Sequence, residues 1–353
     1  MSRADEDIKR WAIILTEGYA WAGSVFRQGG FAVTAAAEDT ERVRSIFVDH
    51  VAKPRRTLLH GQSWGAMVAT RAAELYPKSW EGILLTSGVV AGPATYDFRL
   101  DLRAIYQYLC NNHPRPDEPQ YPLSIGLPTD SKITNADLLA RANECLGVRL
   151  SAAQRTPEQA RKLKTIVDVV RIPERSVVGH LVWGTFSLRD VTQKNGGVSP
   201  LGNEGVRYTG FADDVALNAG VPRFKADPQA VARFASDVDH KGRFAAPVIS
   251  AHGIDDATVF VEGQDTLRER MAAAGNGGRL VQAFVNSHEH SYWGDAMYPP
   301  LFIALLRWVE ADEKPTPQSI AARCVALRSA ASQECLYRPD YTPRPLSSRI
   351  APR

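Results

Sequence analysis

The chain has 353 residues, of which 44% are hydrophobic, and its formal net charge is +3. This length allows one large domain or a core domain with an inserted cap, and the small net charge argues against binding to nucleic acid. No apolar run approaches the roughly 20 residues of a membrane span. The first ten residues are charged and contain no apolar segment, so no signal peptide is visible in the sequence.

Over the first 88 residues, short apolar runs alternate with segments of helical spacing. The apolar runs predict strands, and the spacing of Ile46, Phe47 and Val51 predicts a helix. The predicted strands cover 11–16, 31–36, 57–60 and 82–86, and the predicted helices cover 39–51 and 66–76. This alternation is typical of βαβ units and of a mostly parallel sheet flanked by helices.

The alternation stops after Gly88 and returns near residue 246. The intervening segment is rich in Pro and Asn, and its helical patterns cover 94–110, 135–145, 157–170 and 228–238. Further strands are predicted over 246–252 and 280–285, and further helices over 261–273 and 297–309. The sequence therefore predicts an α/β core formed by 1–88 and 242–312, a large helical cap insertion of 89–241, and a C-terminal surface tail of 313–353.

A G-x-S-x-G pentapeptide at 61–65 lies between a predicted strand and a predicted helix. Strand, sharp turn and helix are the setting of a nucleophile elbow, in which the serine adopts a strained backbone conformation. The residues two positions to either side must then be very small, as Gly61 and Gly65 are. The Ser63 hydroxyl would stand at a helix N-terminus, where the dipole favours a developing negative charge. Ser63 is therefore the predicted nucleophile, and the alternative is a glycine-rich turn that happens to contain a serine.

The candidate acid follows the predicted strand 246–252. The sequence H-G-I-D-D at 252–256 resembles the H-G-x-x-D loop of α/β-hydrolases, in which Asp256 occupies the position of the acid. Asp255 comes one residue early and is interpreted as a turn or supporting residue. Some hydrolases of this fold place the acid one strand earlier, which would point to Asp97 or Asp101.

The candidate base follows the last predicted strand, where two histidines, His288 and His290, both lie within reach. In the related proteins the catalytic histidine comes about five residues past the last apolar residue of the strand and precedes a small or apolar residue. His290, which precedes Ser291, fits this pattern better, and His288 would be a rim residue or a substrate contact. An H-x-H pair can bind zinc, but no further ligands accompany it, so no metal is predicted.

Two backbone N–H groups are expected to bind the oxyanion that forms when the serine attacks a carbonyl group. One should belong to Trp64, which follows the nucleophile. The other should belong to Tyr19, in the loop after the first predicted strand. Glu17 stands in that loop where many relatives have a histidine.

Together, the elbow, the acid loop and the late histidine resemble the α/β-hydrolase superfamily over 11–88 and 247–310. The resemblance implies a Ser63–His290–Asp256 triad, an acyl-enzyme intermediate and no cofactor. Members of the tannase and feruloyl esterase branch carry cysteines where this chain has Gln62 and Ser291, so no branch is assigned. The antiparallel edge strands usual at the start of the fold are not visible.

Three functions are compatible with these motifs. The first is hydrolysis of a small-molecule carboxylic ester under the cap, and the second is peptidase or amidase action on a short peptide with the same triad. The third is a non-hydrolytic lyase or a catalytically silent binding protein. Trp183, Phe186 and Tyr292 are candidates for an aromatic substrate pocket, although core packing is the commoner role of such residues.

Four cysteines stand at Cys110, Cys145, Cys324 and Cys335, and an even count permits two disulfides. Pairing of sequence neighbours, Cys110 with Cys145 and Cys324 with Cys335, would close the shorter loops. The alternative is four buried thiols. Paired cysteines would indicate a secreted or periplasmic protein, and unpaired ones a cytoplasmic protein.

Overall fold

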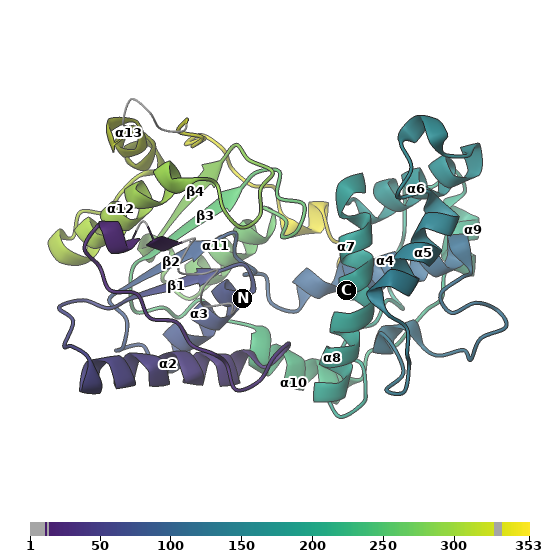
Figure 1. Ribbon diagram of the computed structural model, residues 1–353, viewed down its shortest axis with the longest axis horizontal. Coiled ribbons are helices and arrows are strands. Elements are labelled where there is room, and N and C mark those ends of the chain that lie inside the picture. The colour runs from purple at the N-terminus through teal and green to yellow at the C-terminus, as the bar shows by residue number, and fades with distance from the viewer. Residues whose placement is uncertain (1–10, 13, 328–333) are drawn as a thin grey trace. The chain divides into compact units, whose positions relative to one another are not determined.

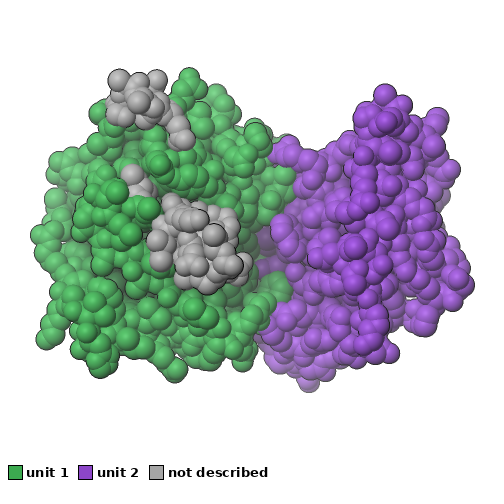
Figure 2. Space-filling model, in the orientation of Figure 1, with its two compact units in different colours: residues 1–92, 237–345 green, residues 93–236, 346–353 purple. Residues whose placement is uncertain are grey.

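Figure 1 shows a computed structural model that describes residues 11, 12, 14–327 and 334–353. The chain divides into two compact units. Unit 1 consists of Met1–Gly92 and Asp237–Pro345, and unit 2 consists of Pro93–Ser236 and Leu346–Arg353 (Figure 2). Both units are therefore assembled from two stretches of chain.

In unit 1, four parallel strands form one sheet in the order β1-β2-β3-β4. They are β1 (Leu58–Gln62), β2 (Gly82–Thr86), β3 (Val248–Gly253) and β4 (Leu280–Val285). Every residue of β2 and β3 is buried, as expected for inner strands of a parallel sheet covered on both faces. The register aligns Gln62 with Thr86 and Gly253 with Val285, so the carboxyl ends of the strands lie along one edge.

Helices cover the sheet on both sides (Figure 1). They are α2 (Val33–His50), α3 (Trp64–Leu75), α11 (Gly263–Ala273), α12 (Tyr298–Ala311) and α13 (Pro317–Leu327). The largely apolar α12 buries Leu301 and Leu305 in a core that also contains Ile249 and Val281 of the sheet. In Figure 1, α12 and α13 lie on one side of the sheet and α2 and α3 on the other.

The two strands predicted nearest the start of the chain are wrong. Residues 11, 12 and 14–16 are helical, and Trp11 and Ile14, three positions apart on one helical face, are buried against α12. The segment predicted as the strand 31–36 contains the start of α2 at Val33, because alanines, which favour helix, continue the chain there. The described sheet therefore has four strands.

The segment treated as a surface tail contributes to the core of unit 1. Ile320 and Cys324 of α13 are buried, and Tyr337 forms an antiparallel bridge with Val285 of β4. The residues from Leu346 onward belong to unit 2, where Arg353 contacts Asp101. The prediction of a surface tail is therefore wrong for these segments. The helical spacing of α13 gives this helix an apolar face, which is buried in the core of unit 1.

The described part of unit 2 is helical. Its helices are α4 (Ala94–Cys110), α5 (Asn135–Leu146), α6 (Pro157–Val170), α7 (Val177–Val182), α8 (Leu188–Lys194), α9 (Asp214–Gly220) and α10 (Pro228–Val238). The boundary between the two units falls within α10, whose last two residues belong to unit 1. Capping boxes begin α5 at Thr134 and α6 at Thr156. A π-helical segment, Trp183–Ser187, joins α7 to α8. None of the helices in the described ranges is long and apolar enough to span a bilayer.

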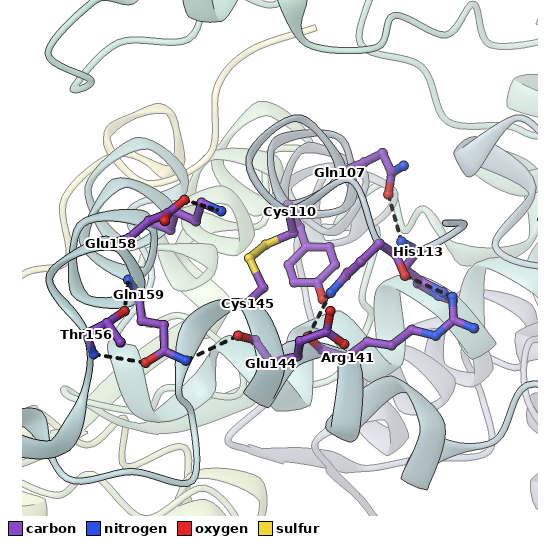
Figure 3. The surroundings of a disulfide bond; sticks show 12 residues. Gln107, Cys110, His113, Arg141, Glu144, Cys145, Thr156, Glu158 and Gln159 are labelled. Carbon is purple, nitrogen blue, oxygen red and sulfur yellow. Dashed lines mark hydrogen bonds and ion pairs between the residues drawn. A yellow bond between two sulfur atoms is a disulfide. The ribbon is translucent and has the colours of Figure 1, made fainter. Parts of the chain in front are cut away.

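Two disulfides join the cysteines in the predicted pairs. Cys110, the last residue of α4, is bonded to Cys145 near the end of α5, with their Cα atoms 5.7 Å apart (Figure 3). Cys324 of α13 is bonded to Cys335, with a Cα–Cα distance of 5.9 Å. Each bond lies within one unit, so each restrains local packing.

Candidate active site

Ser63 occupies the sharp turn between β1 and α3. Its backbone angles are φ 56° and ψ −124°, a conformation that is rare for a residue with a side chain. Its N–H donates to the carbonyl of Thr86, and its own carbonyl accepts from Val89, so the turn is tied to the end of β2. These bonds hold the strained turn and present the hydroxyl at the carboxyl edge of the sheet.

The two glycines of the pentapeptide differ in their surroundings. A Cβ added to Gly61 would lie 2.7 Å from the Cβ of Ala69 in α3, which is closer than packed carbons can approach. A Cβ added to Gly65 would meet no atom within 4 Å. The prediction that only a very small residue fits is therefore explained by packing at Gly61. At Gly65 the structure gives no steric reason for a glycine.

The loop after β3 holds Asp256, whose side chain is fully buried. Its Oδ1 accepts hydrogen bonds from the backbone N–H groups of Thr258 (2.8 Å) and Val259 (3.0 Å). These bonds fix the carboxylate and leave Oδ2 for a further donor.

The loop after β4 brings His290 to the same place. Its Nδ1 lies 2.7 Å from Oδ2 of Asp256, and its Nε2 lies 2.7 Å from Oγ of Ser63. The acid and histidine loops are also bonded to each other, because the N–H of Asp255 donates to the carbonyl of Ser287 at 3.1 Å. A Cβ on Gly253 would lie 2.9 Å from that same carbonyl, so the close approach of the loops requires glycine.

The parallel sheet of this chain has a serine at a strand–helix turn, an acid after a later strand and a histidine after the last strand. The chain has the α/β-hydrolase fold. Within the fold, the three polar side chains come from loops at the carboxyl ends of β1, β3 and β4, which the register aligns. The catalytic roles of the three residues remain predictions.

Neither a family model nor a curated protein matches this sequence. Among solved structures, feruloyl esterase B from Aspergillus oryzae aligns at 12% identity and a TM-score of 0.35, over 79% of this chain and 64% of that one. A carboxylesterase of Nitrososphaera gargenis aligns at 14% identity and a TM-score of 0.35, over 86% and 87%. A monoacylglycerol lipase of Paleococcus ferrophilus aligns at 15% identity and a TM-score of 0.30, over 74% and 73%. The chain thus spans less than two thirds of the length of the Aspergillus enzyme.

His252, at the end of β3, supports the acid loop of this hydrolase fold. It is completely buried, and its Nε2–H donates to the carbonyl of Val259 at 2.8 Å. Its Nδ1 accepts from the amide of Gln264 at 3.0 Å, and Oε1 of Gln264 accepts from the hydroxyl of Ser250. Burial lowers the pKa of His252, so the ring is neutral. No sequence signal pointed to Gln264 or Ser250 as supports of this loop.

The second histidine of the loop, His288, is at the surface. The His288 side chain is 70% exposed, and its Nε2 lies 3.2 Å from a carboxylate oxygen of Glu289. Within the described ranges, no group of three or more His, Cys, Asp or Glu side chains could hold a metal ion. His288 is thus placed as a rim residue, and its contact with a substrate stays a prediction.

The two predicted oxyanion donors differ. Trp64 is the first residue of α3, where the backbone N–H precedes the first intrahelical hydrogen bond and points out of the helix end. The N–H of Tyr19 already donates to the carbonyl of Ile14 at 3.2 Å. The prediction for Tyr19 assumed a loop after a strand, but the preceding segment is helical and uses this N–H at its end. Tyr19 is therefore wrong as a donor, and its ring packs against Phe302.

The predicted pocket aromatics lie in different environments. In unit 1, Tyr292 is half-buried and stacks on Tyr298 of α12, with ring centroids 5.1 Å apart, so one of its faces is used by the core. In unit 2, Trp183 and Phe186 belong to the π-helical segment, and both are half-buried. Their contact with a substrate stays a prediction.

The alternative acids are bound elsewhere. Asp101 accepts hydrogen bonds from the Tyr208 hydroxyl (2.6 Å) and from Arg353 (3.0 Å), all within unit 2. Asp97 lies 3.6 Å from the same guanidinium. Because Asp256 lies against His290 instead, the structure favours Asp256 over both as the partner of the histidine.

Proposed function

We propose that this chain is a serine hydrolase that cleaves carboxylic esters, with Ser63 as nucleophile, His290 as base and Asp256 as orienting acid. One observation carries the proposal: the two 2.7 Å contacts that link Asp256, His290 and Ser63 in series. A serine hydroxyl is a weak nucleophile at neutral pH and requires such a base.

The contacts suggest a sequence of steps. His290 Nε2 accepts the Ser63 proton as Oγ bonds to the ester carbonyl carbon, and the N–H of Trp64 donates to the resulting oxyanion. Collapse of this intermediate breaks the bond to the alcohol oxygen, which receives the proton from His290. Water then attacks the acyl-enzyme, with His290 again as base, and releases the carboxylic acid and free Ser63. Asp256 accepts from Nδ1–H throughout and stabilises the imidazolium.

Esters are favoured over amides on chemical grounds. An alkoxide is a better leaving group than the anion of an amine, and an ester carbonyl is less stabilised by resonance than an amide carbonyl, so an ester needs less stabilisation of the intermediate. Of the two predicted oxyanion donors, Tyr19 already donates to Ile14, which leaves Trp64. A site with fewer donors loses roughly 10²–10³ in rate for each missing one, and this loss matters more for the less reactive amide.

The experiment compares p-nitrophenyl acetate with aminoacyl p-nitroanilides, using wild type and Ser63→Ala. We expect the ester to be the better substrate and Ser63→Ala to lower its kcat/KM about 10⁴-fold or more. The matched control is Ser87→Ala, which removes a buried hydroxyl beyond β2 that has no hydrogen-bond partner among the described residues. A preference for anilides would support the peptidase alternative, and equal activity of Ser63→Ala and wild type would refute both hydrolase proposals.

We also infer that the protein works in an oxidising compartment, secreted or periplasmic, and acts on a small-molecule ester. The two disulfides support this location, because such bonds rarely persist in a reducing cytosol. The role of the helical insertion as a cap remains a proposal as well. Measuring free thiols in protein purified from its natural source tests the location, and four free thiols would contradict it.

A further inference from the structure

Unit 2 contains an open cavity of about 490 Å³ at the end of helix α4. This volume lies within the roughly 300–1,000 Å³ of small-molecule binding sites. The lining residues come from the end of α4, from the loop 114–123 and from the turn 220–224, which all belong to unit 2. The cavity is therefore complete within one unit, whereas Ser63 belongs to the other.

Three aromatic rings form a wall of this cavity. Tyr108, Tyr121 and Phe224 line it, and each is half-buried, so part of each side chain is accessible. The hydroxyl of Tyr121 is buried beside the guanidinium of Arg103, so this residue offers its ring to the cavity. A Cβ on Gly220 would overlap a ring carbon of Tyr108, so glycine is what allows the Tyr108 ring to lie there.

Two amide side chains in the lining have an unused donor and an unused acceptor. Oδ1 of Asn111 accepts from Nε2 of Gln107 at 3.3 Å, which leaves its Nδ2 as a donor. Nε2 of Gln120 donates to the carbonyls of Arg115 (2.8 Å) and Glu118 (2.7 Å), which leaves its Oε1 as an acceptor. Among the described residues, neither remaining group has a partner. A ligand that satisfies both must donate and accept hydrogen bonds.

The cavity is electrically neutral. None of the residues that line it is charged. The charged residues beside the loop are paired with one another, Arg115 with Glu144 at 2.6 Å and Arg141 with Glu118 at 2.5 Å. Because binding sites for ionic groups present a complementary charge, this lining favours a neutral ligand over a carboxylate, a phosphate or an ammonium group.

The walls of the cavity are fixed by contacts behind them. The side chain of Gln107 donates to the carbonyl of Pro114 (2.9 Å) and accepts from the N–H of His113 (3.0 Å; Figure 3). The completely buried Asn203 accepts from the N–H of Phe224 through Oδ1 (2.7 Å) and donates its own N–H to the carbonyl of Phe224 (2.9 Å). A ligand would therefore order little of the protein when it binds, which lowers the cost of binding.

We propose that this cavity binds a neutral saccharide, with a C–H face of the sugar on the aromatic wall and its hydroxyls bonded to Asn111 and Gln120. The face of an aromatic ring is negative and attracts the weakly positive C–H groups of a sugar. Each sugar hydroxyl both donates and accepts, as the two unused amide groups require. A proline-rich peptide also packs on aromatic rings, but its prolines have no N–H to donate to Gln120.

Titration of the full chain with cellobiose, maltose, xylobiose and lactose, followed by saturation-transfer NMR, tests the proposal. We expect at least one of these disaccharides to bind saturably and to receive saturation at the C–H protons of one sugar ring. Tyr108→Ala should weaken that binding about tenfold or more, because it removes part of the aromatic wall. The matched control is Phe211→Ala, which removes a half-buried ring of unit 2 outside the cavity and should leave the affinity unchanged.

A second variant changes the cavity without changing its packing. Asn111 ends α4 with a φ of 48°, a left-handed conformation that glycine adopts freely. Asn111→Gly therefore removes the amide group and leaves the backbone unstrained. We expect it to bind the disaccharide about 3- to 10-fold more weakly than wild type, the usual effect of one hydrogen bond.

Four outcomes would overturn the proposal. They are the absence of saturable binding by all four disaccharides, equal affinity of wild type and Tyr108→Ala, equally tight binding of sorbitol, which has hydroxyls but no ring, and binding of a tetraproline peptide where no disaccharide binds. If thermal unfolding shows that Tyr108→Ala does not fold, unchanged affinity in Asn111→Gly would refute the site instead. Ser63→Ala should bind the disaccharide as wild type does, so a failure of the proposed ester hydrolysis would leave these readings intact.

Discussion

The Oδ1 oxygen of Asp256 is held by groups other than His290. Two backbone N–H groups bind its Oδ1, and one of them belongs to Val259, whose carbonyl accepts from His252. Gln264 in turn fixes the ring of His252. His252 is thus a positioning residue that acts on the acid through the loop backbone and directly, because its Nε2 also lies 3.5 Å from Oδ2 of Asp256.

We expect His252→Ala to lower kcat about 10- to 100-fold with little change in KM, because a shifted acid loop misaligns His290. His252→Gln, which can still donate to the carbonyl of Val259, should restore part of the loss. Steady-state kinetics with p-nitrophenyl acetate and thermal unfolding measure both effects.

The control for this prediction is His240→Ala. His240 is also buried and donates to a backbone carbonyl, that of Val90, which is not part of the acid loop. His252→Ala and His240→Ala should lower the unfolding temperature by similar amounts, and only His252→Ala should lower kcat. Equal kcat values for both variants would exclude a positioning role.

The three candidate catalytic residues could be predicted because each follows a strand within a short, recognisable motif. The environment of Tyr19 could not be predicted, because its role as an oxyanion donor depended on interpreting Trp11 and Ile14 as strand residues. A short apolar run does not distinguish a strand from a buried helix. Gln264 has no local signal, since its role depends on Ser250 and His252, which only the fold brings to it.

At the scale of elements, the turn between β1 and α3 depends on close packing. Gly61→Ala would place a Cβ 2.7 Å from the Cβ of Ala69, so strand and helix must separate. We expect a loss of about 1–3 kcal/mol in the free energy of unfolding, the usual cost of overpacking, together with reduced ester hydrolysis. Urea denaturation measures the loss.

Gly65→Ala is the matched variant, because its Cβ would meet nothing within 4 Å. Its free energy of unfolding should stay within about 0.5 kcal/mol of wild type. Similar destabilisation by both substitutions would mean that the packing of this turn is described wrongly.

Helix α4 provides a pH dependence. Burial raises the pKa of Asp97 to about 7, although Arg353 lowers it. The ordinary pKa of an aspartate is near 3.9, so the folded state binds this proton more tightly than the unfolded state. The contribution of Asp97 to stability is therefore lost as pH rises from about 4 to 7. Asp97→Asn should raise the unfolding temperature at pH 8 by about 2–4 °C or more and change it little at pH 4.

Calorimetric scans at both pH values test this prediction, with Asp130→Asn at an exposed position of unit 2 as control. The control should shift the unfolding temperature little at either pH. A gain for Asp97→Asn that is the same at pH 4 and pH 8 would show that ionisation of this carboxyl group is not the cause.

The sequence predicts the bounds of some helices well and those of others poorly. The helices Ala94–Cys110, Pro157–Val170 and Pro228–Val238 begin and end where the sequence predicts, and capping residues and prolines mark some of their starts. The segment around Val33 has no such marker, and its alanines extend the helix into a region predicted as strand. The π-helical segment has no local sequence signal.

On the scale of the whole molecule, the disulfides stabilise the two units separately. The Cys110–Cys145 bond spans 35 positions and the Cys324–Cys335 bond spans 11. In the chain-entropy model the longer loop stabilises more, by about 4 kcal/mol against about 3 kcal/mol. Replacing Cys110 and Cys145 with Ser should therefore lower the unfolding temperature more than replacing Cys324 and Cys335.

Thermal unfolding of the two double variants, with reduced wild type alongside, measures these contributions. Reduced wild type should unfold at or below the temperature of the less stable variant. An unchanged unfolding temperature on reduction, or a larger loss from the shorter loop, would contradict the account.

The parallel sheet and the interruption of the core by a long helical segment could be predicted from the alternation of short apolar runs and helices. Contacts between segments that are distant in the sequence could not be predicted. One example is the contact of Arg353 with Asp101, which lies 252 positions earlier. No local pattern specifies such pairs, because both partners are ordinary charged residues until the fold brings them together.

The central claim is that Ser63 is the nucleophile. Treatment with a fluorophosphonate, followed by intact-mass measurement and peptide mapping, tests it most directly. We predict one adduct per chain on the peptide that contains Ser63, and none in Ser63→Ala. An adduct on another residue, or equal labelling of wild type and Ser63→Ala, would contradict the claim.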